Sequence, residues 1–187
     1  QTCALPIYQS LIEPKKVKDF LMIDTSSRLT NQYKQFCAEN NLSVALLKKE
    51  ADDIDKLVQT IKANITFFDE IYKEGNLYEE PAVAEIEGLM WKGKADIITD
   101  EIIIDLKTTS NILDFKWSAK KYNYDSQAYI YQQLFGKPLV FFVADKLTYQ
   151  LGIFRPTENF LLGGERKVQK AVEVYNTYFG ENPTDDI

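Results

Sequence analysis

Two carboxylates and a lysine lie close together in the segment Gly88 to Thr109, which reads GLMWKGKADIITDEIIIDLKTT. Asp105 and Lys107 are two residues apart in an apolar run, so a β-strand would place both side chains on one face. The apolar runs on either side of Asp100–Glu101 predict a β-hairpin with its turn there. Pairing of the two strands would bring Asp96 close to Asp105 and Lys107.

Such a group of side chains is suited to binding a divalent metal ion. Carboxylate oxygens are the protein ligands that Mg²⁺ prefers, and substrate phosphate oxygens complete its coordination. Mn²⁺ is the alternative ion. A nearby lysine could orient the attacking water and offset charge on a phosphate. The alternative without chemistry is a half-buried salt bridge, either Asp105 to Lys107 or Asp96 to Lys94.

The pattern extends beyond one D-x-K tripeptide. Asp96 ends the motif G-K-A-D, and Asp105 follows after eight residues within I-D-L-K-T-T. About twenty residues later comes Gln127-x-x-x-Tyr131, on one face of a predicted helix. This order of motifs resembles the PD-(D/E)xK nuclease superfamily. Within it, the chain resembles the phage-type exodeoxyribonuclease VIII (RecE-like) branch and its RecB-like relatives.

The resemblance implies a role for each matching residue. Asp96, Asp105 and Lys107 would be catalytic, with the metal held by the two carboxylates and the main-chain carbonyl of Leu106. Lys107 would position the nucleophilic water. The residues expected to bind substrate are Gln127, Tyr131, Lys94, Lys120 and Lys121.

A further metal ligand is expected upstream of the hairpin. Glu80, with Glu79 as the alternative, matches a glutamate that precedes the G-K-A-D motif in the family. A solvated strand face explains this glutamate equally well.

The first seven residues, QTCALPI, are what a run of bases resembling a common sequencing adapter encodes. We therefore expect residues 1–7 to be non-native and residues 8–187 to form a single, N-terminally truncated domain. The alternative is a genuine heptapeptide. The codon of Tyr8 would share a base with the adapter, so the original residue was Tyr, His, Asn or Asp. Glu13-Pro14 aligns Tyr8 with a family histidine at the metal site, and histidine is the residue we expect in the natural protein.

The segment 111–122 combines aromatic and basic residues. Aromatic side chains beside lysines suit stacking on unpaired bases together with backbone contacts. The alternative is that the aromatic residues pack in the core. The residues concerned are Phe115, Trp117, Lys116, Lys120 and Lys121.

Composition narrows the chemistry. The 187 residues include no histidine, which excludes Ser-His-Asp triads and histidine-ligated zinc. The two cysteines cannot form a disulfide framework, and a cytoplasmic location is expected. The net charge of −6 argues against wide, sequence-independent coating of nucleic acid but allows DNA in a cleft. No apolar run approaches the roughly twenty residues of a membrane span, so no membrane role is indicated.

The sequence predicts one α/β domain in which a central mixed β-sheet is flanked by helices, the restriction-endonuclease-like PD-(D/E)xK core. The sheet is expected from residues 76–106 and 139–154. The resemblance implies a Mg²⁺-dependent 5′-to-3′ exonuclease on duplex DNA that leaves 3′ single strands for recombination. It also implies a homo-oligomeric ring around DNA and a single-strand annealing protein as partner.

Two other functions stay open. One is a Cas4-like or RecB-like nuclease of another polarity, although the lack of a four-cysteine iron–sulfur set counts against the cluster-bearing versions. The other is a catalytically inactive DNA-binding or assembly module of the same fold.

Overall fold

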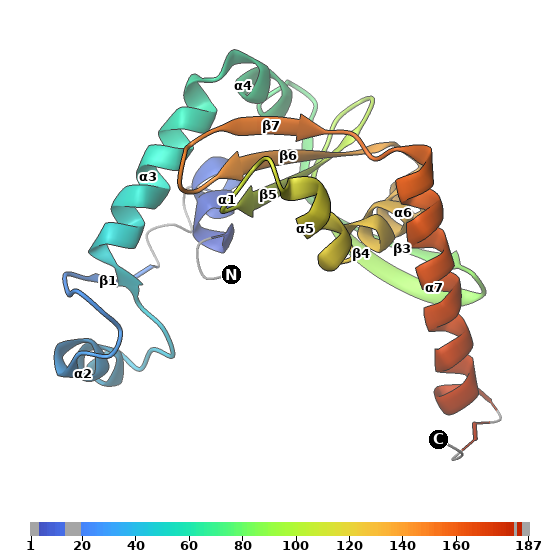
Figure 1. Ribbon diagram of the computed structural model, residues 1–187, viewed down its shortest axis with the longest axis horizontal. Helices are drawn as coiled ribbons and strands as arrows, with labels where there is room; N and C mark the ends of the chain where they lie inside the picture. The colour runs from blue at the N-terminus through green and yellow to red at the C-terminus, as the bar shows by residue number, and fades with distance from the viewer. Residues whose placement is uncertain (1–3, 14–19, 182, 185–187) are drawn as a thin grey trace.

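A five-stranded sheet runs through the centre of the protein (Figure 1). The computed structural model describes residues 4–13, 20–181 and 183–184. The strands are β3 (Leu77–Ile86), β4 (Leu89–Ile98), β5 (Ile103–Thr109), β6 (Leu139–Asp145) and β7 (Leu151–Phe154). They lie in the order β3-β4-β5-β6-β7, with β5 and β6 parallel and the other neighbours antiparallel. The predicted mixed sheet is confirmed.

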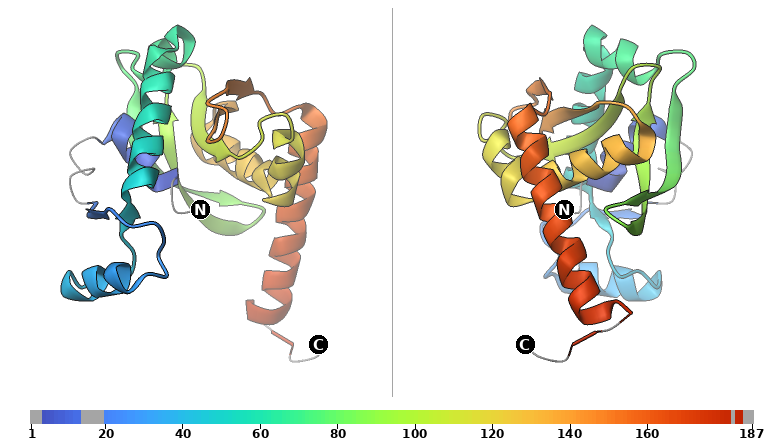
Figure 2. Two further views of the ribbon diagram at one scale, coloured as in Figure 1. Left: turned by 60° about the vertical axis from the view of Figure 1, so that its left-hand side comes forward. Right: turned by 90° about the vertical axis from the view of Figure 1, so that its right-hand side faces the viewer.

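Helices cover both faces of the sheet, as predicted (Figures 1 and 2). One apolar core joins the sheet to the N-terminal helices, and a second core joins the opposite face to the C-terminal helices. The first group is α1 (Ala4–Ile12), α3 (Lys48–Ala63) and α4 (Ile65–Ile71), and the second is α5 (Phe115–Lys121), α6 (Tyr124–Phe135) and α7 (Glu158–Phe179). The last turns of α7 extend beyond the sheet (Figure 2).

A small N-terminal unit lies beside these layers, at the left of Figure 1. The short strands β1 (Met22–Ile23) and β2 (Leu46–Leu47) pair in parallel, with α2 (Asn31–Glu39) between them in the chain. Its side chains form a separate apolar cluster.

Alternation along β5 decides which side chains face which core. Ile104 and Leu106 face the core that contains α1, α3 and α4. Asp105 and Lys107 therefore point to the other face, toward α6. The neighbouring β6 is buried at every position, which explains its continuous apolar sequence.

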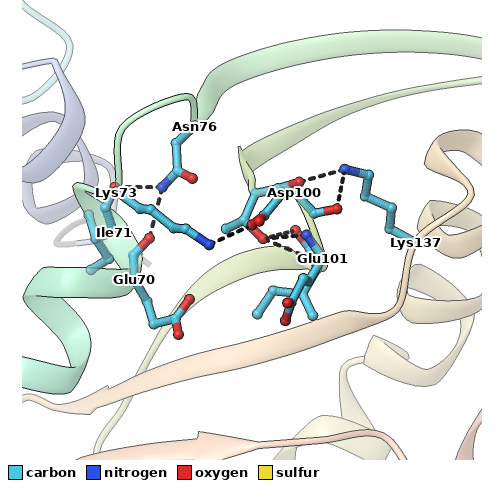
Figure 3. Close-up of polar contacts among 9 residues, drawn as sticks. Glu70, Ile71, Lys73, Asn76, Asp100, Glu101 and Lys137 are labelled. Carbon is cyan, nitrogen blue, oxygen red and sulfur yellow. Dashed lines mark hydrogen bonds and ion pairs between the residues drawn. The ribbon is translucent and has the colours of Figure 1, made fainter.

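The turn between β4 and β5 is held by contacts from two other segments (Figure 3). Lys73 forms an ion pair with Asp100, with 2.7 Å between Nζ and Oδ1. Lys137 donates to the carbonyl oxygens of Thr99 and Asp100 at 2.6 and 3.0 Å. Thr99 Oγ1 accepts hydrogen bonds from the backbone N–H groups of Glu101 and Ile102, which closes the turn. These contacts fix the register in which β4 meets β5.

Helices α6 and α7 pack closely where α6 begins. The buried carboxylate of Asp125 forms an ion pair with Lys167, with 2.8 Å between Oδ2 and Nζ. A Cβ at Gly164 would overlap the carbonyl of Asp125 and lie 2.9 Å from the backbone nitrogen of Ser126. Only glycine permits this approach, so α7 holds the start of α6 in place.

The predicted non-native segment is described only in part. Residues 1–3 lie outside the described residues, as does Pro14 of the Glu-Pro motif, whereas residues 4–7 belong to α1. Among the described helices, none is both long and apolar enough to span a membrane.

Candidate active site

Asp96 and Asp105 lie where β4 and β5 separate. The strands pair at Ile97–Ile104 and Ile98–Ile103. Asp96 directly precedes the paired residues of β4, and Asp105 directly follows those of β5. Asp96 Oδ2 accepts a hydrogen bond of 2.8 Å from the backbone N–H of Leu106. The Asp96 side chain thus takes the place that a backbone carbonyl would have in a continued ladder.

Asp105 is the most buried residue of the group. It is 2% exposed, and its Oδ1 accepts a hydrogen bond of 2.7 Å from Nε2 of Gln127 on α6. Its Oδ2 lies 2.7 Å from Nζ of Lys107, an ion pair without hydrogen-bond geometry. A buried carboxylate requires such partners, because an unpaired charge in the interior is strongly destabilising.

Tyr124 supports Lys107 from the opposite side. The Lys107 ammonium lies 4.5 Å from the centroid of the Tyr124 ring, a cation–π contact. No role for Tyr124 was predicted from the sequence. Its position one helical turn before Gln127, on the same face of α6, is the signal that could have found it.

The close approach of α6 to β4 explains the glycine of the G-K-A-D motif. A Cβ at Gly93 would lie 2.7 Å from Leu134 Cδ1 and 3.2 Å from Tyr131 Cε1. The Tyr131 hydroxyl donates to the main-chain carbonyl of Lys94 at 3.0 Å. Tyr131 therefore fixes α6 on β4, while Gln127 on the same helix face reaches Asp105.

The predicted substrate-binding lysines form no ion pair with Asp96 or Asp105 within the described ranges. The Lys94 ammonium forms an ion pair with Glu79 on β3. Lys120 and Lys121 are exposed in the last turn of α5. The charge of Lys94 nevertheless acts to lower the pKa of Asp96, so Lys94 lies near this carboxylate, whereas Lys120 and Lys121 are on a different element.

Burial and mutual repulsion make it unfavourable for Asp96 and Asp105 to be ionised at the same time. Burial, followed by the neighbouring Asp105 carboxylate, raises the pKa of Asp96 to about 7. Burial acts to lower the pKa of Lys107, but the adjacent Asp105 outweighs it, and the net pKa of Lys107 is raised. Lys107 is therefore protonated at neutral pH and acts as a positive charge rather than as a general base.

The donor set fits a hard divalent ion. Two carboxylates converge and supply the hard oxygen atoms that such an ion prefers, and Asp105 Oδ2 has only the Lys107 ammonium as a partner among the described residues. Across the described ranges there is no group of three or more His, Cys, Asp or Glu side chains arranged to hold a metal. Glu80 pairs with Ala95 in the sheet and does not join Asp96 and Asp105. A metal here would rely on substrate, solvent and main-chain oxygens for its other ligands.

Tyr8 on α1 contacts the backbone of Asp96 from the face of the sheet opposite α6. Its hydroxyl donates to the main-chain carbonyl of Asp96 at 3.4 Å. Burial, followed by the charge of Asp96, raises the pKa of Tyr8, so its phenol stays neutral. The structure thus places residue 8 at the carboxylate cluster, where the sequence analysis expected a family histidine.

We expect a divalent ion to stabilise the protein more at pH 8 than at pH 5.5. With the pKa of Asp96 raised to about 7, the folded state holds a proton between about pH 4 and pH 7 that the unfolded chain has released. The free energy of unfolding of the metal-free protein therefore falls as pH rises through this interval. Metal binding requires the ionised carboxylate, so it is strongest above pH 7. At 100 times Kd the gain is about 2.7 kcal/mol, roughly 5–11 °C in Tm.

The measurement is Tm with and without Mg²⁺ or Mn²⁺ at both pH values. Asp96→Asn serves as the control, because it removes the titrating carboxylate and should abolish most of the metal effect. An equal gain at both pH values, or an unchanged gain in Asp96→Asn, would contradict the expectation.

The fold and the two carboxylates with their lysine define a PD-(D/E)xK-type domain, which confirms the superfamily resemblance. Residues 7–177 match the family described as PDDEXK-like domain of unknown function (DUF3799), and the chain belongs to this family. No curated protein matches the sequence.

A solved structure shares this fold. A crystal structure of a "Putative exonuclease" from Eubacterium rectale is similar, with a TM-score of 0.65 and 23% identity over 93% of this chain and 66% of that one. The chain therefore spans slightly less than two thirds of that protein. The structure of SSO0001 is 12% identical, with a TM-score of 0.40 over 93% of this chain and 87% of that one.

Proposed function

We propose that this protein is a metal-dependent DNA exonuclease that hydrolyses phosphodiester bonds. The observation that supports the proposal is the convergence of Asp96, Asp105 and Lys107 at the point where two strands separate. The family membership supports a nuclease in general. The similarity to the "Putative exonuclease" from Eubacterium rectale supports an exonuclease.

Each residue of the proposed active site would have a distinct role. Asp96, Asp105 and the main-chain carbonyl of Leu106 would hold Mg²⁺, with Mn²⁺ as the alternative. When bound, such an ion polarises the phosphodiester and lowers the pKa of water. Lys107, kept protonated by Asp105, orients the attacking water and offsets charge that develops on the phosphate. Gln127 holds Asp105 in one orientation through its hydrogen bond to Oδ1.

The polarity of the exonuclease, its product and its partners are inferred from the family resemblance. We propose 5′-to-3′ degradation of duplex DNA, giving 3′ single strands for recombination. A homo-oligomeric ring and a single-strand annealing protein would be the corresponding assembly and partner. A Cas4-like or RecB-like polarity and an inactive DNA-binding module are the competing functions.

The test is degradation of linear duplex DNA labelled at either the 5′ or the 3′ end, with Mg²⁺ present. Early release of 5′-labelled nucleotides is expected. Early release of 3′ label would instead support the other polarity. Asp105→Asn is the control, since it removes the charge but keeps the shape of a buried side chain. Binding of DNA without degradation by the wild-type chain would favour the inactive module.

We expect Tyr8→His to increase Mg²⁺- or Mn²⁺-dependent hydrolysis about 10-fold or more. Changes in groups that surround a metal alter affinity or activity by 10–100-fold, and residue 8 lies against Asp96. Tyr8→Phe is the matched control, because it removes the hydroxyl without adding a ligand. An equal effect of both substitutions, measured as initial rates on duplex DNA, would show that histidine is not the residue this site requires.

A further inference from the structure

A pocket of about 280 Å³ lies between α5, the end of β7 and the start of α7. It is separate from the carboxylate cluster, none of whose residues line it. Its volume is slightly below the roughly 300–1,000 Å³ of pockets that take drug-sized ligands. The space therefore suits a single ring system rather than a large molecule.

The floor of the pocket is aromatic. The ring centroids of Phe115 and Phe154 lie 4.7 Å apart, and those of Phe115 and Phe141 lie 5.9 Å apart. Phe160 joins the floor with its ring 6.5 Å from that of Phe141. Phe115 and Phe141 are 2% exposed and form the packed base of the floor, whereas the half-buried rings of Phe154 and Phe160 supply the surface that a ligand can contact.

The rim of the pocket is cationic. Lys116 and Lys120 are one helical turn apart on α5 and exposed, and Arg155 follows β7 on the opposite side. None of the residues that line the pocket is acidic, although the chain carries 28 Asp and Glu against 22 Lys and Arg. A positive rim in an acidic protein indicates a negatively charged ligand.

An aromatic floor under a cationic rim matches one ligand chemistry. A nucleobase stacks on aromatic rings, and its phosphate pairs with lysine and arginine. A purely apolar ligand would make no use of the three cations. Inorganic phosphate would make no use of the floor.

The pocket also shares a wall with the proposed active site. The ring of Phe115 lies 6.1 Å from that of Tyr124, and Lys107 Nζ lies 4.5 Å from the Tyr124 ring. One layer of aromatic side chains therefore separates the pocket from Lys107. A short stretch of one DNA strand can span both places.

We propose that this pocket binds one unpaired nucleotide of the DNA substrate, with the base on the aromatic floor and the phosphate among Lys116, Lys120 and Arg155. The proposal rests on the nuclease function proposed above. It assigns to the enzyme a contact with a base that has left the duplex, next to the place where the strand is cut. Trp117, 61% exposed beside Lys116, lies outside the pocket lining.

The test uses the full chain with Asp105→Asn, which is expected to bind DNA without cutting it. Anisotropy of a fluorescein-labelled oligothymidylate measures its Kd with Arg155→Glu added. At least a 10-fold weaker affinity is expected. Arg166→Glu is the matched control, since Arg166 is exposed on α7 and does not line the pocket, and it should change Kd less than twofold. An abasic oligonucleotide of equal length should bind roughly 5- to 150-fold more weakly to the Asp105→Asn protein, as expected for stacking of one base.

Two results would overturn the proposal. One is equal weakening by Arg155→Glu and Arg166→Glu, and the other is equal affinity for the abasic and normal strands. Hydrolysis of bis(4-nitrophenyl) phosphate by the wild-type chain, a substrate without a base, separates this failure from failure of the nuclease function. Hydrolysis without base-dependent binding refutes the pocket alone. Base-dependent binding without hydrolysis refutes the nuclease alone.

Discussion

Replacement of Lys107 by alanine is expected to reduce the rate of DNA hydrolysis about 10²–10³-fold. The substitution removes a positive charge fixed between Asp105 and Tyr124, at 2.7 Å from Oδ2 and 4.5 Å from the ring. Loss of one such preorganised group commonly costs a factor of this size. The measurement is the initial rate on linear duplex DNA with Mg²⁺, for protein whose circular dichroism is unchanged.

Lys92→Ala is the matched control for this experiment. Lys92 lies on β4 near the same site but is exposed, and it pairs with Val83 at the outer part of the sheet. It should retain activity within about twofold. Equal, measurable hydrolysis by wild type and Lys107→Ala would refute the role of Lys107, whereas DNA binding without hydrolysis by the wild type would favour the DNA-binding module.

The second large effect is expected at Gly164, where α7 crosses the start of α6. Gly164→Ala should destabilise the protein by about 3 kcal/mol, or roughly 6–12 °C in Tm, because its Cβ would overlap the carbonyl of Asp125. The helices cannot separate without moving α6, which carries Gln127. A loss of nuclease rate should therefore accompany the loss of stability.

Gly163→Ala is the control for this prediction. A Cβ at Gly163 would lie 3.6 Å from Asp125 Oδ2, an ordinary contact, and alanine favours a helix over glycine by about 1 kcal/mol. Thermal unfolding of both variants checks the contrast. Similar Tm values for the two would show that α7 can shift on α6 without cost.

The sequence alone was sufficient to predict the central sheet and the hairpin that carries the carboxylates. Alternation around Asp105 and Lys107 assigned both to one face, and the turn forms at Asp100 as expected. These features depend on local periodicity, which the chain displays directly. The i, i+4 spacing of Gln127 and Tyr131 likewise placed both on one face of α6.

The remaining features depend on distances between segments far apart in the chain. Tyr131 contacts the main chain of Lys94, and Glu80 does not reach the carboxylates. The motif glycine is explained only by the closeness of α6 to β4. Of the two aromatic residues left open on α5, Phe115 is in the core and Trp117 is exposed. No periodicity in one segment encodes such contacts.

The polar contacts at the site differ in how far apart their partners lie along the chain. Asp96 and Leu106 are 10 residues apart, and Asp105 and Gln127 are 22 apart, whereas Tyr8 reaches Asp96 across 88 residues. Short loops close with a smaller loss of entropy, and contacts between distant segments slow folding. The carboxylates and Gln127 can therefore meet before α1 docks. Substitutions at residue 8 should then tune an assembled site rather than decide whether it forms.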